Sequence, residues 1–557
     1  MFIRVKKSKN SPRKTVQIVQ SVRQKDKVRQ KTLRYIGVAM DEEELKLLMQ
    51  LAESIKAKME QEGQLSLFSP EELAKLKRRS EADTRLDRRN ADGKNFQVDI
   101  RELKEESRVI DGIHDVYGTM YEQLNLGSIF TARQNRSGEI FKEMVLARIA
   151  SPGSKLATTA LLQRSFGQSI DVNAVYRMMD QITDTVITQL QDRVYQETVS
   201  LFGNNLDVIF FDATTLYYES FSEDSFRRNG YSKDMKFNQP QVLMALMVTR
   251  EGLPVGYEVF PGNTYEGHTL IPCLQALRKK YGVTRVVFVA DSGMYNQKNI
   301  EALVSEGFEY IVGARIKSTG KAVQDQILDT GSYVAVNSEE SYTVIHLDGE
   351  RLVVNYSTSR AKKNRFDRIQ AIDKLKQRLS KQSKLGAKDL LNNYGYKKYL
   401  KATVPGELVI DEAKLQLDEK WDGLMGIKTN SPSISPIAAI RQYQQLWIVE
   451  EAFRINKHTL EIRPIFHYKE TRVKAHIAIC FAAFALMAQL RYRIKIQQVP
   501  LSLNQIHEAL LSVQTSILYN KKNGFSYSLP SSLSKAAKQI YKTLNIHRSH
   551  TPKIIDS

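Results

Sequence analysis

The segment from Leu206 to Ala314 constrains the fold most strongly, because it passes from consecutive strands to alternating helices and strands. Val208–Phe211, Gln241–Thr249 and Leu253–Phe260 have the apolar or alternating character of strands. The last two are joined by Glu251-Gly252, which is typical of a tight turn. A predicted helix, strand, helix and strand then follow in order: His268–Tyr281, Arg285–Ala290, Asn296–Glu306 and Tyr310–Ala314.

This order is that of a ribonuclease H-like core, in which a mixed sheet is flanked by helices. Tyr333–Thr358 predicts two strands around Asp348-Gly349, and Leu408–Leu417 predicts another strand. A β-rich insertion therefore interrupts the core, which Ile437–Leu460 and Arg472–Ile494 complete as helices. The predicted fold class is α/β, with a ribonuclease H-like mixed sheet, a β-rich insertion, and β and helical regions at the N-terminus.

Composition suggests how the whole chain is divided. The first 40 residues contain 12 Lys and Arg against one acid, Asp26, and predict strands at Thr15–Arg23 and Lys27–Ile36. Asp41–Gln61 predicts a helix, and Gly63–Phe96 a linker. The predicted regions are a basic N-terminal region (1–105), a helical domain (106–204), the first segment of the core (205–319), a β-rich basic insertion (320–420), the second segment of the core (421–495) and a basic C-terminal region (496–557).

The charge balance predicts a polyanionic partner. The chain has 82 Lys and Arg against 62 Asp and Glu, a net charge of +20, and nucleic acid is the commonest partner of such chains. A solvated basic surface without a partner is the alternative. Cys273 and Cys480 are too few for a disulfide scaffold or a cysteine zinc site, so a reducing cytosol is expected. The apolar run Ile477–Leu490 is shorter than the roughly 20 residues of a membrane span, so no membrane partner is expected.

Two aspartates share a context that suggests chemistry. Asp212 and Asp291 each directly follow a short apolar strand. A carboxylate at the C-terminal end of a strand lies at the sheet edge where α/β proteins bind ligands. Alternatively, each aspartate caps the next element or starts a turn. Two carboxylates that converge at one edge repel each other unless a cation lies between them, so the pair predicts a metal site.

A third acid lies on the predicted helix 437–460. At about 100° per residue, Tyr443, Glu450, Arg454 and Lys457 share one face of a continuous helix. The alternative is an exposed ion pair between Glu450 and Arg454. Trp447, one turn before Glu450, is predicted to pack in the core.

Three carboxylates suit Mg²⁺ or Mn²⁺, which prefer hard oxygen ligands. Two such ions about 3.5–4 Å apart hold both the attacking and the leaving oxygen at phosphorus. His458, His467 and His476 are nine residues apart, which is not a zinc-ligand spacing, and are expected to be phosphate contacts or structural histidines.

The chain resembles bacterial insertion-sequence transposases of the DDE class, in the group with a Y-x2-R-x3-E-x6-K signature. Tyr443, Glu450 and Lys457 match this spacing, whereas Leu446 stands at the arginine position, where Arg441 or Arg454 is the candidate substitute. The other segments that carry the resemblance are Asp212–Thr215, Gly230–Asp234, Pro261–Asn263 with Glu266 and Thr269, Ala290–Met294, Trp421–Gly423, Thr429–Asn430 and Arg463–His476.

The resemblance implies that Asp212, Asp291 and Glu450 hold two Mg²⁺ ions, with Mn²⁺ as a substitute. Glu451 is the neighbouring alternative to Glu450. Tyr443 and Lys457, with Arg454 beside them, would contact the DNA backbone. Recognition of the terminal inverted repeats is expected from the basic segment 1–40 and from helices between residues 133 and 181, with Lys155, Arg164 and Arg177 as candidates.

The function that the resemblance implies is DNA transposition. The protein would bind double-stranded DNA at the transposon ends and the target, cut it with metal ions and join the freed end, as a homodimer. A ribonuclease H-like nuclease that does not join strands is one alternative. An inactive relic that only binds DNA is another, which Leu446 favours and the presence of all three acids opposes.

Overall fold

The computed structural model describes residues 2–7, 14–24, 27–39, scattered positions between 45 and 56, 98–202, 206, 208–232, 235–281, 287–294, 296–380, 398–402 and 408–555. The chain forms two compact units, residues 1–101 and 102–557, which we describe separately. The predicted linker at Gly63–Phe96 and most of the predicted helix at Asp41–Gln61 lie outside the described residues.

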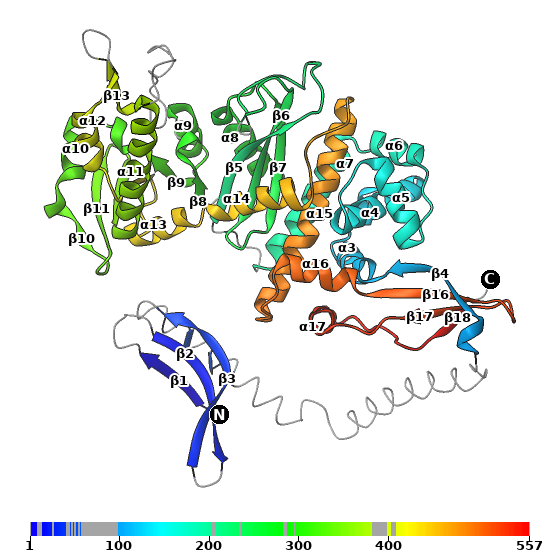
Figure 1. Ribbon diagram of the computed structural model, residues 1–557. Helices are drawn as coiled ribbons and strands as arrows, with labels where there is room; N and C mark the ends of the chain where they lie inside the picture. Colours follow the sequence, from blue (N-terminus) through cyan, green and yellow to red (C-terminus); the bar gives the residue numbers. More distant parts are fainter. Residues whose placement is uncertain are drawn as a thin grey trace. The chain divides into compact units, whose positions relative to one another are not determined.

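The first unit contains a three-stranded antiparallel sheet in the order β1-β2-β3 (Figure 1). Its strands are β1 (Phe2–Lys7), β2 (Lys14–Gln24) and β3 (Lys27–Ala39). Val16, Ile18 and Ile36 are buried together with Ala52. The two predicted strands are confirmed. β1 was not predicted, because its alternating apolar and basic residues look like part of the basic tail.

The second unit is built on a nine-stranded sheet in the order β10-β11-β12-β15-β9-β8-β5-β6-β7 (Figure 1). β5, β6 and β7 form an antiparallel meander, and β8 and β9 extend it by parallel pairing beside β5. This is the ribonuclease H-like arrangement that the sequence predicts. The bounds are β5 (Val208–Tyr217), β6 (Gln241–Thr249), β7 (Pro254–Pro261), β8 (Val287–Ala290) and β9 (Glu309–Ala314).

Both faces of this sheet are covered, which explains why its strands are apolar throughout. Successive side chains alternate between faces, so Phe210 and Val289 belong to one core and Phe211 and Ala290 to the other. Helices α8 (Leu270–Tyr281) and α9 (Gln297–Ser305) contribute to the second core. The first core is shared with α14 (Trp447–Arg454) and α15 (Glu470–Ile496).

The predicted insertion extends the same sheet instead of forming a separate β body. β15 (Leu424–Thr429) pairs with β9, and the hairpin of β11 and β12 continues outward from it. The Asp348-Gly349 turn of this hairpin is confirmed. The predicted strand at Leu408–Leu417 is only partly correct, because Asp411 caps a helix there by accepting from the backbone N–H of Lys414 at 3.2 Å. The bounds are β10 (Val334–Ala335), β11 (Glu340–Leu347), β12 (Glu350–Ser357), β13 (Leu400–Ala402), β14 (Leu408–Ile410), α10 (Lys321–Leu328) and α12 (Glu412–Glu419).

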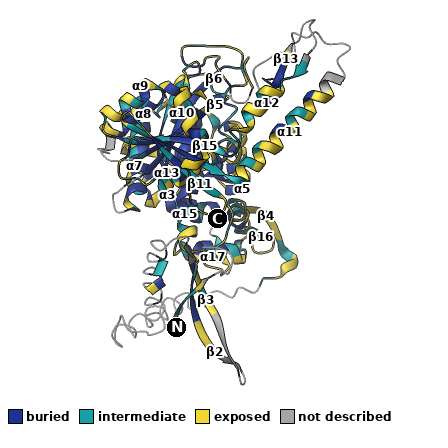
Figure 2. Cartoon of the chain, turned by 90° about the vertical axis from the view of Figure 1, so that its left-hand side faces the viewer, coloured by how far each residue is buried: buried dark blue, intermediate teal, exposed yellow. Residues whose placement is uncertain are grey.

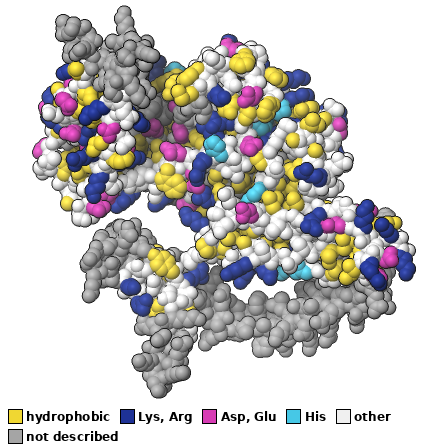
Figure 3. All heavy atoms as spheres, in the orientation of Figure 1, with side chains coloured by type: hydrophobic (Ala, Val, Ile, Leu, Met, Phe, Trp, Pro, Cys, Tyr) yellow, Lys and Arg dark blue, Asp and Glu magenta, His cyan; other side chains and the backbone are white. Residues whose placement is uncertain are grey.

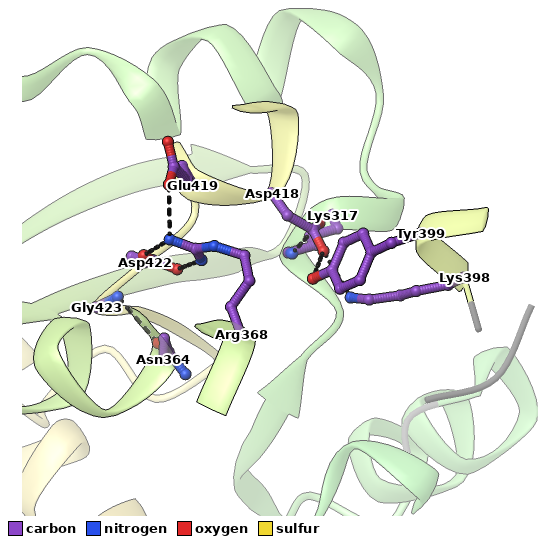
Figure 4. Close-up of polar contacts among 9 residues, drawn as sticks. All are labelled: Lys317, Asn364, Arg368, Lys398, Tyr399, Asp418, Glu419, Asp422 and Gly423. Atoms are coloured by element: carbon purple, nitrogen blue, oxygen red, sulfur yellow. Dashed lines mark hydrogen bonds and ion pairs between the residues drawn. The ribbon is translucent and has the colours of Figure 1, made fainter. Parts of the chain in front are cut away.

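The basic run at Arg360–Lys401 begins as helix α11 (Thr358–Ser380), whose side chains are largely exposed (Figure 2). One of its arginines is buried and anchors the helix (Figure 4). Arg368 donates to both carboxylate oxygens of Asp422 at 2.7 Å and to Glu419 at 3.1 Å. Nearby, Asp418 accepts from Lys317 at 2.8 Å and from the Tyr399 hydroxyl at 2.7 Å. The middle of α11 is therefore held by the ion pairs of Arg368, while its outer face presents basic side chains.

The helical region surrounds the long helix α15. α15 packs against α4, α6, α7 and β7. α15 is long and apolar enough to cross a membrane, yet 94% of its most apolar stretch is buried in the protein, as in a core helix. The bounds are α4 (Asn135–Ala150), α5 (Lys155–Phe166), α6 (Val172–Asp180) and α7 (Asp184–Ser200).

The C-terminal region returns to the start of the second unit. β16 (Gln514–Asn520) pairs with β4 (Leu103–Ile110), in a sheet of order β18-β17-β16-β4. Arg548 also bonds Asp111 at 2.7 Å and Asp115 at 3.0 Å. The stretch predicted as helical from residue 106 thus begins as a strand, because its partner lies about 400 residues away in the chain. The remaining bounds are α16 (Leu503–Leu511), β17 (Ser526–Pro530), α17 (Lys535–Thr543) and β18 (Lys553–Ile555).

Candidate active site

Asp212 and Asp291 lie beside each other on neighbouring strands. β5 and β8 pair in parallel with Phe210 opposite Val289, so two residues further along Asp212 is level with Asp291. Alternation along each strand places both carboxylates on the face of Phe210 and Val289, which is the face covered by α14 and α15.

The two aspartates differ in their position along the strands. Asp291 directly follows β8, as predicted. The prediction that β5 ends at Asp212 is wrong, because β6 pairs with β5 as far as Tyr217 and keeps it extended. The pair therefore lies at the point where β8 ends and β5 continues.

Backbone groups orient both carboxylates. The N–H of Ala213 donates to Oδ1 of Asp212 at 2.8 Å, and the N–H of Ser292 donates to Oδ1 of Asp291 at 2.6 Å. The second bond opens the short 3₁₀ helix Ser292–Met294, so Asp291 also has the turn-forming contact that the alternative interpretation predicts. Each bond engages one oxygen of a group that has two, and so fixes the direction in which the carboxylate points.

The helix predicted at Ile437–Leu460 is divided, so the prediction of one continuous face is wrong. α13 (Pro436–Gln444) ends before Gln445, α14 begins at Trp447, and residues 455–459 form a π-helical turn. At the break the N–H of Leu446 donates to the Tyr443 carbonyl at 3.0 Å, a three-residue spacing that tightens the chain. Neither Gly nor Pro marks this break in the sequence.

Tyr443 nevertheless links the candidate acids. Its hydroxyl donates to Oδ1 of Asp291 at 3.3 Å. It also lies over Gly313 of β9, which is level with Asp291, where an added Cβ would come within 2.3 Å of the hydroxyl oxygen. Burial, the negative charge of Asp291 and, more weakly, that of Glu450 raise the pKa of the Tyr443 hydroxyl. Glu450 thus lies within electrostatic reach of the group that contacts Asp291.

The structure distinguishes Glu450 from Glu451. Glu451 is partly buried and forms ion pairs with Arg491 at 3.0 Å and Arg454 at 3.3 Å. Glu450 is exposed on α14, which packs on β5 and β6 through Val449, Ala452 and Phe453. These contacts assign Glu451 to an ion-pair network on the side of α15, and Glu450 to the side of Tyr443.

The donor chemistry of this site suits a hard divalent cation, since all three candidate ligands are carboxylates. Within the residues that the structure describes, no three His, Cys, Asp or Glu side chains are close enough together to hold a metal ion. The structure thus brings together Asp212 and Asp291 and, through Tyr443, the neighbourhood of Glu450.

The candidate DNA-contacting residues fall in different environments. Arg177 is exposed on α6, and Arg454 is paired with Glu451. Lys457 lies 6.0 Å from the centre of the Phe453 ring. Lys155 is only 4% exposed and donates to Nδ1 of His476 at 3.2 Å, so its side chain lies in the interior and not on the open surface.

Other findings could not be foreseen from the sequence. Arg360 at the start of α11 acts on the site, since its charge lowers the pKa of Tyr443 and partly offsets the effects of burial and the acids. Leu446, at the arginine position of the signature, packs against the core. Trp447 is 53% exposed, so the prediction that it packs in the core is wrong.

The surface of the second unit is rich in basic side chains, which are spread over the face shown in Figure 3, including around the sheet of β4 and β16–β18. This distribution agrees with a polyanionic partner and does not by itself locate a binding site.

Comparisons with known proteins identify the family. The transposase DDE domain matches residues 203–486, and the IS1634 family transposase N-terminal domain matches residues 3–70. Among solved structures, a piggyBac transposase synaptic complex with hairpin DNA is similar at 9% identity and a TM-score of 0.37, over 72% of this chain and 77% of that chain. A Mos1 transposase paired-end complex with the left transposon end is similar at 13% identity and a TM-score of 0.14, over 30% of this chain and 56% of that chain. No curated protein matches. The chain belongs to the DDE-domain transposases of insertion sequences.

Proposed function

We propose that Asp212, Asp291 and Glu450 are the metal ligands of this DNA transposase and that they hold two Mg²⁺ ions, for which Mn²⁺ would substitute. The observation that carries the proposal is the register of the sheet. It sets Asp212 level with Asp291 on the face that α14 covers. Tyr443 donates a hydrogen bond to Asp291, and the negative charge of Glu450 raises the pKa of the Tyr443 hydroxyl. When bound, the ions would polarise the scissile phosphate and lower the pKa of an attacking hydroxyl.

The backbone and side chains of the protein position the proposed metal ligands and the DNA. Ala213 and Ser292 fix one oxygen of each aspartate through their backbone N–H groups, and the Tyr443 hydroxyl donates to the same oxygen of Asp291 as Ser292 does. Because neighbouring carboxylates repel each other, Asp212 and Asp291 would favour a cation between them. Lys457 and Arg454 would bind backbone phosphates next to the reacting bond.

The proposed reaction has two in-line displacements at phosphorus. Water first breaks the phosphodiester at the transposon end and leaves a 3′-hydroxyl. That hydroxyl then attacks a phosphodiester of the target, forming one bond and releasing one strand end. Positioning of the reactants contributes most of the rate enhancement in such a site.

The assembly and location are also proposals. Two transposon ends must be joined, so we propose a homodimer on DNA, with regions 1–105 and 106–204 binding the terminal inverted repeats. A cytoplasmic, nucleoid-associated protein is consistent with the burial of the single apolar helix found among the described residues.

The test is an assay of cleavage and joining on DNA that carries the element's own ends, with Mg²⁺, Mn²⁺ or neither. We expect cleaved and joined products only with a metal, and none with Asp212→Asn or Asp291→Asn. Cleavage without joining would favour a nuclease, and binding without cleavage in either metal would favour an inactive relic.

A further inference from the structure

A second polar site lies away from the carboxylates. A cavity of about 170 Å³ is enclosed by the start of α5, by α6, by residues 461–467 and by α15. The residues that give it its character are cationic or aromatic: Arg148, Lys155, Tyr176, Arg463, His467 and His476. Glu461 is the one carboxylate in its described lining, and its side chain is exposed.

Two of these cations are buried. Arg148 and Lys155 are each 4% exposed. Arg148 donates to the Gly153 carbonyl at 2.9 Å. This acceptor is neutral, so it does not compensate the positive charge of Arg148. A buried positive charge without a carboxylate partner destabilises the fold. Burial and the neighbouring Arg148 accordingly lower the pKa of the Lys155 ammonium to about 7.

The hydrogen bonds of Lys155 are incomplete. Nε2 of His476 is 2.9 Å from the Ile462 carbonyl and must donate to it, so Nδ1 of the same ring is an acceptor. Lys155 donates one N–H to that Nδ1 at 3.2 Å. An ammonium has three N–H groups, and among the described residues His476 is the single hydrogen-bond acceptor that Lys155 contacts. Lys155 lines the cavity, so its two remaining N–H groups can donate to a group bound there.

The cavity is attached to the strand that carries Asp212. The N–H of Ile465 donates to the carbonyl of Tyr217, and the guanidinium of Arg463 lies 5.4 Å from the centre of the Tyr217 ring. Tyr217 ends β5, five residues beyond Asp212, or about 17 Å along the strand. Such a distance corresponds to about five base-pair steps of B-DNA.

We infer that this cavity binds one phosphate group through Lys155 and Arg463, and that the phosphate is supplied by the DNA backbone a few nucleotides from the bond that is cut. The chemistry is that of an oxyanion accepting charge-assisted hydrogen bonds, and the N-terminus of α5 in the cavity wall favours the same charge. The cavity chemistry stands by itself, whereas the assignment of the occupant to DNA rests on the proposed function.

The first experiment tests the phosphate chemistry. Inorganic phosphate is titrated into the full-length chain in a calorimeter, with wild type, Lys155→Met, Arg463→Gln and a matched control, Lys142→Met. Lys142 lies on α4 and is already paired with Glu122 at 2.7 Å. We expect saturable binding by wild type and the control, and at least about tenfold weaker binding by the other two. Thermal melting of each variant shows that it is folded, and Arg463→Gln serves if Lys155→Met is not.

The second experiment identifies the source of the phosphate. The element's terminal duplex is prepared with a single neutral methylphosphonate at each successive position, and affinity is measured without metal. For a backbone phosphate, one position weakens wild-type binding about tenfold, and Lys155→Met is insensitive to that position. For Lys155→Met, the slope of log affinity against log salt concentration should also decrease in magnitude by about one.

The outcomes separate the proposals. Phosphate binding without a sensitive position supports the cavity chemistry and overturns its assignment to DNA. The absence of both signals overturns the inference. A wild type that binds phosphate but never cuts DNA overturns the proposed function and leaves the cavity standing.

Discussion

The carboxylate site and the cationic cavity are opposite solutions to the same problem, the collection of like charges. At the sheet, Asp212 and Asp291 are at most half-buried and are oriented by backbone N–H groups. In the cavity, Arg148 and Lys155 are almost fully buried, and Lys155 contacts a neutral histidine. The comparison teaches that water screens the acids until a ligand arrives, whereas the buried cations lower the stability of the fold until an anion reaches them.

The largest expected effect comes from removing a charge at the sheet. Asp291→Asn preserves shape and removes a metal ligand, so cleavage should fall by at least about 1,000-fold, because the metal contributes several kcal/mol to the transition state. DNA affinity should remain within about threefold of wild type, as measured by fluorescence anisotropy. Asp348→Asn, at the exposed β11–β12 turn, is the matched control and should retain full cleavage. Equal losses of cleavage in both variants would contradict a specific role for Asp291.

The buried cation should make stability depend on pH. The pKa of Lys155 is about 7 in the folded chain and about 10.5 when unfolded, so between these values the unfolded state binds the extra proton. The free energy of unfolding should therefore decrease by roughly 1 kcal/mol per pH unit as the pH falls from 10 to 7. Urea denaturation of wild type and Lys155→Met measures this slope, which the variant should lack.

Buried histidines extend that dependence to lower pH. Burial and the nearby cations lower the pKa of His467 to about 3, below its unfolded value of 6.5. Its contribution to stability is therefore complete above pH 6.5 and decreases as the pH falls from 6.5 toward 3. A His467→Gln variant should show a shallower loss of stability over this range in the same denaturation experiment. A slope identical to that of wild type would show that folding leaves the pKa of His467 unchanged.

The smallest effect is expected at Tyr443. Tyr443→Phe removes the hydrogen bond to Asp291 and keeps the ring over Gly313. Loss of one such bond should reduce the cleavage rate about three- to tenfold, corresponding to roughly 1 kcal/mol. The rate is measured at saturating metal and DNA. An unchanged rate would show that the backbone bond from Ser292 is sufficient to orient Asp291.

The sequence predicts the core of the fold because apolar runs and turn signals define β5 to β9 locally. It also predicts that two aspartates meet, since both follow strands of one sheet. It does not predict that β5 continues past Asp212, because the pairing with β6 decides that. The break at Gln445–Leu446 and the strand β4 depend on tertiary contacts and have no local signal.

The cavity also could not be predicted from the sequence. Lys155 begins a helix in a basic protein, and its sequence context favours an exposed DNA contact. Its burial against His476 brings together residues 321 positions apart, which no spacing reveals. The neutral histidine that accepts its hydrogen bond is likewise visible only in the folded chain.

The most direct test of the account compares two adjacent acids. Glu450→Gln and Glu451→Gln are made in the full-length chain, and Mg²⁺-dependent cleavage and joining are measured on DNA with the element's own ends, alongside DNA affinity. The account predicts that Glu450→Gln abolishes both reactions and retains DNA binding. Glu451→Gln weakens its ion pairs with Arg491 and Arg454 and should retain most of the activity. Full activity in Glu450→Gln, or selective loss in Glu451→Gln, would contradict the proposed ligand set.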